Sequence, residues 1–467
     1  MDTTPGDPAA SAADEVRRYC AWGQVFKREG RYADAAAAFA AALQIDPQHA
    51  DAHNDLGAVF HLVGNDSDAI TQYRRALALR PDHLNALSNL GTALLERNDV
   101  REAIATYEHA LEIGSAKPEP TIAVQQAKVR TFLGLAQLLN GNLKHGWQNY
   151  QSRWAAGATR PASTREELWL GQSPLVGKTI WLANEQGLGD MIQFVRYVNW
   201  VAAQNPAKLY LEAPAALERL FSISFGDRAE IRCIQESATL PYCDEVTTVP
   251  SLALAAGTQI ETIPNAVPYL RAPTPREDTR WRLDTLPRGL RVGLVWAGNQ
   301  THSNDARRSI PWAKFVQALS PGHVCYVSLQ KEVPTADITF AKSIRFDDSE
   351  ADASLNRSTT SVEPTPRENE KLEITDFRDC LHDLAETAAV ISGLDLVIAV
   401  DTSVAHLAGA LGKPVWVLLP FAPDWRWMLD RNDSPWYPTM RLFRQPRVAD
   451  WETVLAEVRA ELARLLS

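Results

Sequence analysis

The sequence predicts an α-helical repeat array followed by two α/β domains, each built on a parallel sheet. A 34-residue period runs through the first third of the chain, for example in Gly23, Gly57 and Gly91. From about residue 168 onward, short apolar runs of strand type alternate with helical segments. The clearest unit is 393–420, which reads as strand, polar turn, helix and strand. The class is therefore α followed by α/β.

Size and composition set the outer limits. A chain of 467 residues with 45% hydrophobic and 22% charged residues is typical of a globular protein with about three domains. The net charge of −10 argues against a nucleic-acid partner. The five cysteines are scattered, odd in number and without a CxxC pair, so we expect neither a disulfide framework nor a zinc site.

The first 14 residues are predicted to be a disordered tail. They lack the basic start and the apolar stretch of a signal peptide. No apolar run in the chain is long enough for a transmembrane helix, because charged residues interrupt each one. Together with the cysteine usage, this leads us to expect a cytoplasmic protein.

Residues 15–114 contain three copies of the repeat. Beside the glycines, three further columns recur at 34-residue spacing: Ala35, Ala69 and Ala103; Phe39, Tyr73 and Tyr107; Ala42, Ala76 and Ala110. The small residues would let paired helices approach, the aromatics are expected to fill the space between adjacent repeats, and Pro47 and Pro81 end two repeats. The pattern resembles the tetratricopeptide repeat.

A degenerate fourth copy and a linker are expected over 115–167, with Gly134 and Tyr150 in the glycine and aromatic columns. Trp147 and Trp154 are expected to pack on whatever follows. Repeat arrays commonly present a concave groove to a protein partner. A purely structural extension or a dimer contact stays open.

The α/β part divides into 168–273, 290–446 and a C-terminal helical stretch, 447–467. We predict the following strands and helices: Thr179–Ala183, Met191–Ala203, Leu209–Glu212, Val292–Trp296, Trp312–Leu319, Val324–Leu329, Leu396–Val400, Val415–Leu419 and Trp451–Leu466. A polar, apolar-poor stretch at about 342–371 is predicted to be a disordered insertion. Two consecutive α/β domains should leave a cleft at the carboxyl ends of their strands.

The turn Asp401-Thr402-Ser403 lies between a strand and a helix. Free N–H groups and the helix dipole favour a phosphate at such a position. Thr402 and Ser403 add hydroxyl donors, and His406 lies one turn further on. We therefore predict a diphosphate site. The alternative is an ordinary strand-turn-helix unit in which Asp401 caps the helix.

Gly187-Leu188-Gly189-Asp190 lacks the third glycine of a dinucleotide fingerprint, which weakens an NAD interpretation. Gly187 and Gly189 would let the backbone lie close to a ligand. Asp190, at a helix start facing the cleft, is a candidate general base for a hydroxyl nucleophile. A helix-capping role for Asp190 stays open.

Cationic residues follow two other strands. Arg308 comes after the Gly298 turn, and Lys331 comes after Val324–Leu329. Both are candidate diphosphate ligands, with a solvated loop as the alternative. Trp425, Arg426 and Trp427 suit either stacking on a flat ligand or burial under the last helix. The α/β part has no Asp-x-Asp pair, so no metal site is predicted and cations would take the metal's place.

From about 168 to 466 the chain resembles the heptosyltransferase-like glycosyltransferases of family 9, which have the GT-B fold of two Rossmann-like domains. The motifs are GLGD at 187–190, DTSVAHLAGALGKP at 401–414 and WYPTMRLFRQP at 436–446. Combined with the repeats, the layout resembles the bacterial tetratricopeptide-repeat glycosyltransferases and is similar to that of the protein O-GlcNAc transferases.

The resemblance implies a hexosyl- or heptosyl-type transferase that needs no cofactor and no metal and inverts the anomeric carbon. It implies that Asp190 is the general base. The donor sugar and its diphosphate would be held by Asp401, Thr402, Ser403, His406, Arg308 and Lys331. A protein recruited by the repeats is the expected acceptor. A lipid-linked or polysaccharide acceptor, or a scaffold that only binds nucleotide, is the alternative.

Overall fold

The computed structural model describes residues 8–115, 120–165, 167–235, 242–302, 304–319, 324–337, 372 and 374–467. The predicted insertion at 342–371 lies outside the described residues. The chain divides into two compact units, each taken here by itself. One comprises Met1–Thr159 and Asp424–Leu429, and the other comprises Arg160–Pro423 and Asp430–Ser467.

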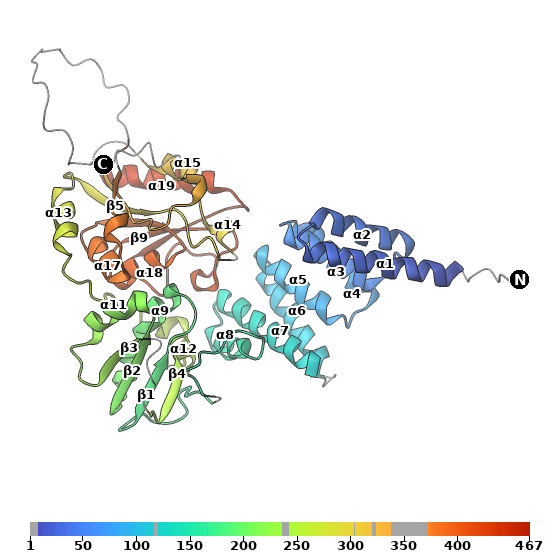
Figure 1. The fold of residues 1–467 in the computed structure, drawn as a ribbon, viewed down its shortest axis with the longest axis horizontal. Helices are drawn as coiled ribbons and strands as arrows, with labels where there is room; N and C mark the ends of the chain where they lie inside the picture. Colours follow the sequence, from blue (N-terminus) through green and yellow to red (C-terminus); the bar gives the residue numbers. More distant parts are fainter. Residues whose placement is uncertain are drawn as a thin grey trace, which may run out of the picture. The chain divides into compact units, whose positions relative to one another are not determined.

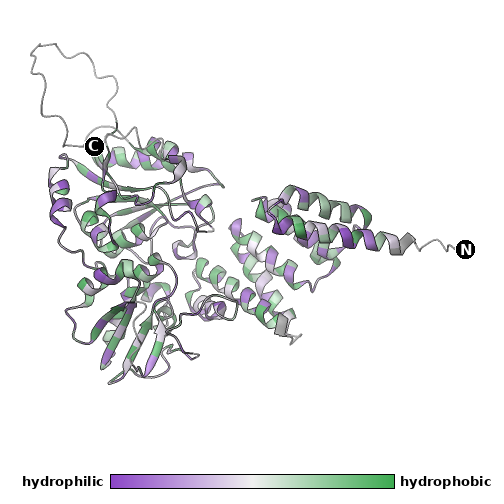
Figure 2. Ribbon diagram, viewed as in Figure 1, coloured by the Kyte–Doolittle hydropathy of each residue, from purple (hydrophilic) through white to green (hydrophobic). Residues whose placement is uncertain are grey.

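The first unit is a series of helical hairpins, drawn in blue to cyan in Figure 1. Its helices are α1 (Pro8–Arg28), α2 (Tyr32–Ile45), α3 (Ala50–Leu62), α4 (Asp66–Leu79), α5 (Leu84–Glu96), α6 (Val100–Ser115), α7 (Pro120–Leu139) and α8 (Leu143–Tyr150). Hydrophobic and hydrophilic residues alternate along these helices (Figure 2), as expected where one face of each is buried. Residues 8–14, expected in the disordered tail, are helical instead.

The repeat columns are explained by close packing inside each hairpin. A Cβ atom added to Gly57 would lie 2.7 Å from Cε1 of Tyr73, and one added to Gly91 would lie 2.5 Å from Cε1 of Tyr107. Each aromatic therefore fills a hollow left by the glycine of its own repeat. Tyr107 also fills space toward the next repeat, as expected, because it stacks on Phe132 of α7 with ring centroids 6.2 Å apart.

The fourth hairpin, α7 with α8, is confirmed as a helical pair. Trp147 on α8 is buried and meets the Trp425 ring edge-on, with centroids 5.1 Å apart. The short 3-10 helix η7 (Trp425–Trp427) packs against α7 in the same unit. Trp425 and Trp427 are buried there, so their expected stacking on a ligand and their expected burial under the last helix were both wrong.

The second unit begins with a four-stranded sheet, drawn in green in Figure 1. Its strands run parallel in the order β3-β2-β1-β4. The elements are β1 (Thr179–Ala183), α9 (Leu188–Phe194), α10 (Val198–Ala202), β2 (Lys208–Ala213), α11 (Ala215–Phe225), β3 (Ile231–Gln235), β4 (Glu245–Thr248) and α12 (Leu252–Ala255). Trp181, Ala183, Cys243 and Val246 form a buried cluster on this sheet.

A second parallel sheet follows, in the order β10-β9-β8-β5-β6-β7. Its elements are α13 (Glu277–Thr285), β5 (Leu290–Val295), α14 (Asp305–Arg308), α15 (Trp312–Phe315), β6 (Val324–Ser328), β7 (Ile374–Asp376), α17 (Leu384–Ser392), β8 (Leu396–Val400), α18 (Ser403–Ala410), β9 (Val415–Leu419), β10 (Met440–Arg444) and α19 (Trp451–Leu466). One core joins β5, β8 and β9 to α15 and the terminal helix α19. The two α/β domains of Rossmann type are thus confirmed.

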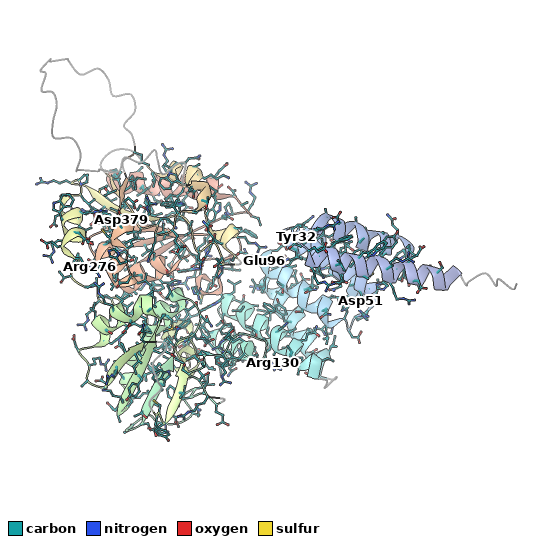
Figure 3. All side chains as sticks on the ribbon, viewed as in Figure 1. Tyr32, Asp51, Glu96, Arg130, Arg276 and Asp379 are labelled. Carbon is teal, nitrogen blue, oxygen red and sulfur yellow. The ribbon has the colours of Figure 1, made fainter. Side chains whose placement is uncertain are left out.

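Contacts across these two domains occur inside the second unit. Helix α9 packs on α18, and α11 packs on α17 (Figure 1). The carboxylate of Glu386 on α17 is buried and forms ion pairs with Arg219 on α11 and with Arg276. Arg276 is labelled in Figure 3. None of the helices in the described part of the chain combines the length and apolarity of a membrane span.

Candidate functional site

The predicted diphosphate turn lies at the carboxyl end of β8. Thr402 is the N-cap of α18, with extended backbone (φ −142°, ψ 168°), and no side chain caps the helix. The interpretation of Asp401 as the cap was therefore wrong, because it precedes the cap residue. The hydroxyl oxygen of Thr402 is buried and has no hydrogen-bond partner among the described residues. The start of α18 thus retains polar groups that a ligand could bind.

Arg308 lies against this turn. Its Nη1 donates to the main-chain oxygen of Asp401 at 2.9 Å, and its Nε lies 3.5 Å from Asp305 Oδ1. A Cβ atom on Gly298 would lie 2.5 Å from Nη2 of Arg308. Glycine at 298 therefore leaves the space that the guanidinium occupies. The structure brings Gly298 and Arg308, which both follow β5, together with Asp401, which follows the neighbouring strand β8.

Gln330 holds the Gly298 turn, a role that the sequence analysis missed. Its buried side chain accepts hydrogen bonds from the N–H groups of Trp296 at 3.1 Å and Ala297 at 3.0 Å, and donates to the oxygen of Ala297 at 3.0 Å. In the sequence, Gln330 could have been recognised as an uncharged polar residue that directly follows the predicted strand Val324–Leu329. Its neighbour Lys331 is exposed and donates to the oxygen of His382 at 3.3 Å.

The GLGD segment forms the first turn of α9. Gly187 is the N-cap, and Asp190 occupies the third helical position. The Oδ2 of Asp190 accepts the N–H of Gly187 at 3.1 Å. Asp190 thus supports the helix start without being the N-cap, and its side chain is half-buried. The positive end of the helix dipole favours its ionised form.

The starts of α9 and α18 lie against each other. A Cβ atom on Gly189 would lie 3.1 Å from Cδ2 of His406 and 3.7 Å from Cα of Ser403. Only a residue without a side chain permits this approach without displacing His406. The backbone beside Asp190 and the backbone beside Thr402 therefore lie next to each other, one from each α/β domain.

His406 is 2% exposed and lies between two polar groups. Its Nδ1 lies 2.9 Å from the hydroxyl of Tyr437, and its Nε2 lies 3.8 Å from Oδ1 of Asp401. Burial raises the pKa of Tyr437 well above its usual value, so the phenol stays neutral. Tyr437 lies in the 436–446 motif, 31 residues beyond His406, and no local pattern indicated a role for it in the site.

In the described ranges, no group of three or more His, Cys, Asp or Glu side chains is arranged to hold a metal ion. Positive charge beside Asp401 comes from Arg308, and the positive end of the α18 dipole lies at the same turn. The side chains of the site can therefore bind an anion at α18 and offer a carboxylate at α9.

Comparison with known proteins finds two kinds of family match. Residues 23–64 match a family model described as TPR repeat, and 63–118 match one described as tetratricopeptide repeat. Residues 381–419, from before α17 to the end of β9, match glycosyltransferase family 9 (heptosyltransferase). The chain therefore carries segments that match tetratricopeptide repeats and one segment that matches glycosyltransferase family 9.

Protein FlbA of Caulobacter vibrioides is 27% identical over 370 residues, which is 74% of this chain and 56% of FlbA. The chain thus spans little more than half the length of this relative. Among solved structures, Pseudomonas aeruginosa pilF is similar at 24% identity and a TM-score of 0.29, over 32% of this chain and 65% of that one. A MamA structure is similar at 20% identity and a TM-score of 0.26, over 30% and 72%.

Proposed function

Since the chain carries tetratricopeptide repeats and a glycosyltransferase family 9 domain, we propose that it transfers a sugar from a nucleotide-diphosphate sugar to an acceptor hydroxyl. One observation supports this most strongly. Gly189, which directly precedes Asp190 at the start of α9, lies beside Ser403 and His406 at the start of α18. A carboxylate and an anion-binding helix start therefore come from opposite domains, as an acceptor half and a donor half of one site require.

The donor diphosphate binds at the start of α18. Main-chain N–H groups and the hydroxyls of Thr402 and Ser403 face the phosphates, and the buried Thr402 oxygen gains the partner it lacks among the described residues. Arg308, held against Asp401, supplies a fixed positive charge. Lys331 follows β6 at the same edge of the sheet and acts as a second cation once the donor is bound.

Asp190 is the general base. As the acceptor oxygen bonds to the anomeric carbon, the bond from that carbon to the diphosphate oxygen breaks, and the acceptor proton passes to the Asp190 carboxylate. Attack from the face opposite the leaving group inverts the anomeric centre. The charge that develops on the diphosphate is stabilised by Arg308 and the α18 dipole, without a metal ion.

The repeats recruit a protein acceptor. Amide side chains from the first helices of successive repeats meet: Asn89 on α5 donates to Asn54 on α3 at 3.0 Å, and Gln125 on α7 donates to Asn85 on α5 at 2.6 Å. Amides offer both a donor and an acceptor to a peptide backbone. The five free cysteines fit action in the reducing cytoplasm.

The test compares Asp190→Asn with Asp227→Asn, whose side chain is 75% exposed. Binding is measured by calorimetry with a panel of nucleoside diphosphates, and transfer is measured with the matching labelled nucleotide-sugar. Asp190→Asn should bind nucleotide within about twofold of the native protein but lose transfer by a factor of about 10²–10⁴, the usual contribution of a general base. Undiminished transfer would remove Asp190 from the mechanism.

Fractionation of the labelled product identifies the acceptor class. Label in the protein fraction, absent with Asp190→Asn, supports a protein acceptor. Label in the lipid or polysaccharide fraction would contradict a protein acceptor and indicate a lipid-linked or a polysaccharide acceptor instead. Nucleotide binding with no turnover of any donor would contradict the enzyme proposal and leave a nucleotide-binding scaffold.

A further inference from the structure

Tyr437 lies in the 436–446 motif and has no role in the proposed reaction so far, yet it is completely buried and touches the site. It belongs to the segment between η7 and β10, and its hydroxyl lies 2.9 Å from Nδ1 of His406. The rings of Tyr437 and His406 lie 5.7 Å apart between centroids. A buried phenol normally has a hydrogen-bond partner, so the question is which of the two groups donates.

A neighbouring network answers this. Arg196 Nη2 donates to the hydroxyl of Tyr269 at 3.1 Å, and that hydroxyl lies 2.9 Å from the main-chain oxygen of Ile192, which can only accept. The single proton of Tyr269 is therefore used on Ile192. The hydroxyl of Tyr437 lies 3.4 Å from that of Tyr269, much further than from His406. The Tyr437 proton has its better acceptor in Nδ1 of His406.

Arg196 anchors this arrangement. It is 3% exposed, and its guanidinium donates to the main-chain oxygens of Gln193 and Trp436 as well as to Tyr269, all of them neutral acceptors. Trp436 directly precedes Tyr437 in the chain. The Arg196 guanidinium carbon also lies 4.4 Å from the centre of the Tyr437 ring. The backbone and the ring of Tyr437 are thus both fixed by a buried cation.

Close packing prevents the two rings from turning away. A Cβ atom on Gly409 would lie 2.6 Å from Cδ1 of Tyr437, and one on Gly189 would lie 3.1 Å from Cδ2 of His406. Each ring therefore lies directly on a glycine of α18 or α9. This packing keeps the two rings where Nδ1 of His406 faces the Tyr437 hydroxyl.

We propose that Tyr437 is a positioning residue that fixes His406 as the neutral tautomer with its proton on Nε2. A neutral imidazole that accepts at Nδ1 must donate at Nε2, the nitrogen that lies 3.8 Å from Asp401. His406 then presents a fixed hydrogen-bond donor on the side of the donor turn. The tautomer follows from the contacts alone. Its effect on transfer rests on the proposed function.

The tautomer is read by long-range ¹H–¹⁵N correlation spectra of the full chain labelled at histidine, with His406→Gln to assign the signal. The native protein should show the Nε2–H pattern for His406. Tyr437→Phe, which removes only the hydroxyl, should lose that single pattern, whereas Tyr242→Phe, at an 82% exposed ring, should keep it. Circular dichroism melting verifies that Tyr437→Phe folds. An Nδ1–H pattern in the native protein, or an unchanged pattern in Tyr437→Phe, overturns the proposal.

Kinetics provide the second measurement. Tyr437→Phe should lower kcat about tenfold with little change in KM for the donor, in line with one lost hydrogen bond to a reacting site. Unchanged kcat in a variant whose tautomer has shifted contradicts the positioning role. If the native protein shows the Nε2–H pattern but transfers no sugar, the proposed function fails while the tautomer assignment stands, so the two failures are distinguishable.

Discussion

Gly189 and His406 lie in different α/β domains, and the bare Cα of one faces the imidazole ring of the other. A methyl group at 189 would be 3.1 Å from Cδ2 of His406. That separation is tighter than ordinary van der Waals contact, so the ring or the helix start would have to yield. The contact explains why a glycine directly precedes the candidate base Asp190.

Gly189→Ala is expected to weaken the site, because His406 is held by Tyr437 and cannot retreat freely. Overpacking of this kind costs about 1–3 kcal/mol. We expect a lower melting temperature and weaker nucleoside diphosphate binding, measured by thermal shift with and without nucleotide. Gly187→Ala serves as the control, since the nearest atom to an added Cβ there is Asp190 Oδ2 at 3.3 Å, the end of a side chain. Equal effects of both variants would contradict the stated reason.

The buried Glu386 carboxylate should contribute strongly to the stability of the α/β unit. It pairs with Arg219 and with Arg276, the latter at 3.0 Å, and is 0% exposed. Glu386→Gln keeps the shape but removes the charge, and should lower the free energy of unfolding by about 1.5–3 kcal/mol. Asp227→Asn, which breaks the exposed pair with Arg271, should cost less than about 1 kcal/mol. Denaturant titration of both variants, followed by tryptophan fluorescence, provides the comparison, and similar losses would contradict it.

The glycine column of the repeats predicts a specific clash. Gly91→Ala places a methyl group 2.5 Å from the buried ring of Tyr107, whose hydroxyl is also bonded to Thr92. We expect a loss of about 1–3 kcal/mol. This outweighs the roughly 1 kcal/mol that alanine gains over glycine in a helix. Tyr107→Leu in the Gly91→Ala background should recover part of the loss in a double-mutant cycle measured by far-UV circular dichroism. Additive losses would show that the ring contact is not the cause.

Alkaline pH should unfold the chain through its buried phenols. Burial raises the pKa values of Tyr73, Tyr107, Tyr197 and Tyr437. A raised folded-state pKa means that the stabilisation is complete below the unfolded value of about 10 and is lost as pH rises above it. Each such tyrosine should lower the free energy of unfolding by up to about 1.4 kcal/mol per pH unit above 10.

Absorbance at 295 nm measures the tyrosinate formed. These four phenols should ionise only together with the loss of far-UV circular dichroism. Ionisation of all tyrosines in one phase before unfolding would contradict the expectation.

Sequence patterns predicted the elements of the donor half closely. The strands Leu396–Val400 and Val415–Leu419 and the helix Trp451–Leu466 have the predicted bounds, because continuous apolar runs and an amphipathic period end at clear turn signals. Helix α9 was predicted to begin at Met191 but begins at Leu188. Glycines at this start concealed it, since glycine has low helix propensity, and the turn is held by packing against α18 and by the Asp190 hydrogen bond to Gly187.

The sequence by itself determined the order of the chain: a 34-residue helical repeat, two parallel α/β domains, and the polar turns at Gly187–Asp190 and Asp401–His406. These follow from local periodicity and turn chemistry, which depend on neighbouring residues. Only the tertiary structure decided which side chains share a site. Tyr437 with His406, Arg196 with Trp436 and Gln330 with Trp296 are contacts across 31, 240 and 34 residues. Such contacts are set by how the sheets and helices pack, and no local pattern carries them.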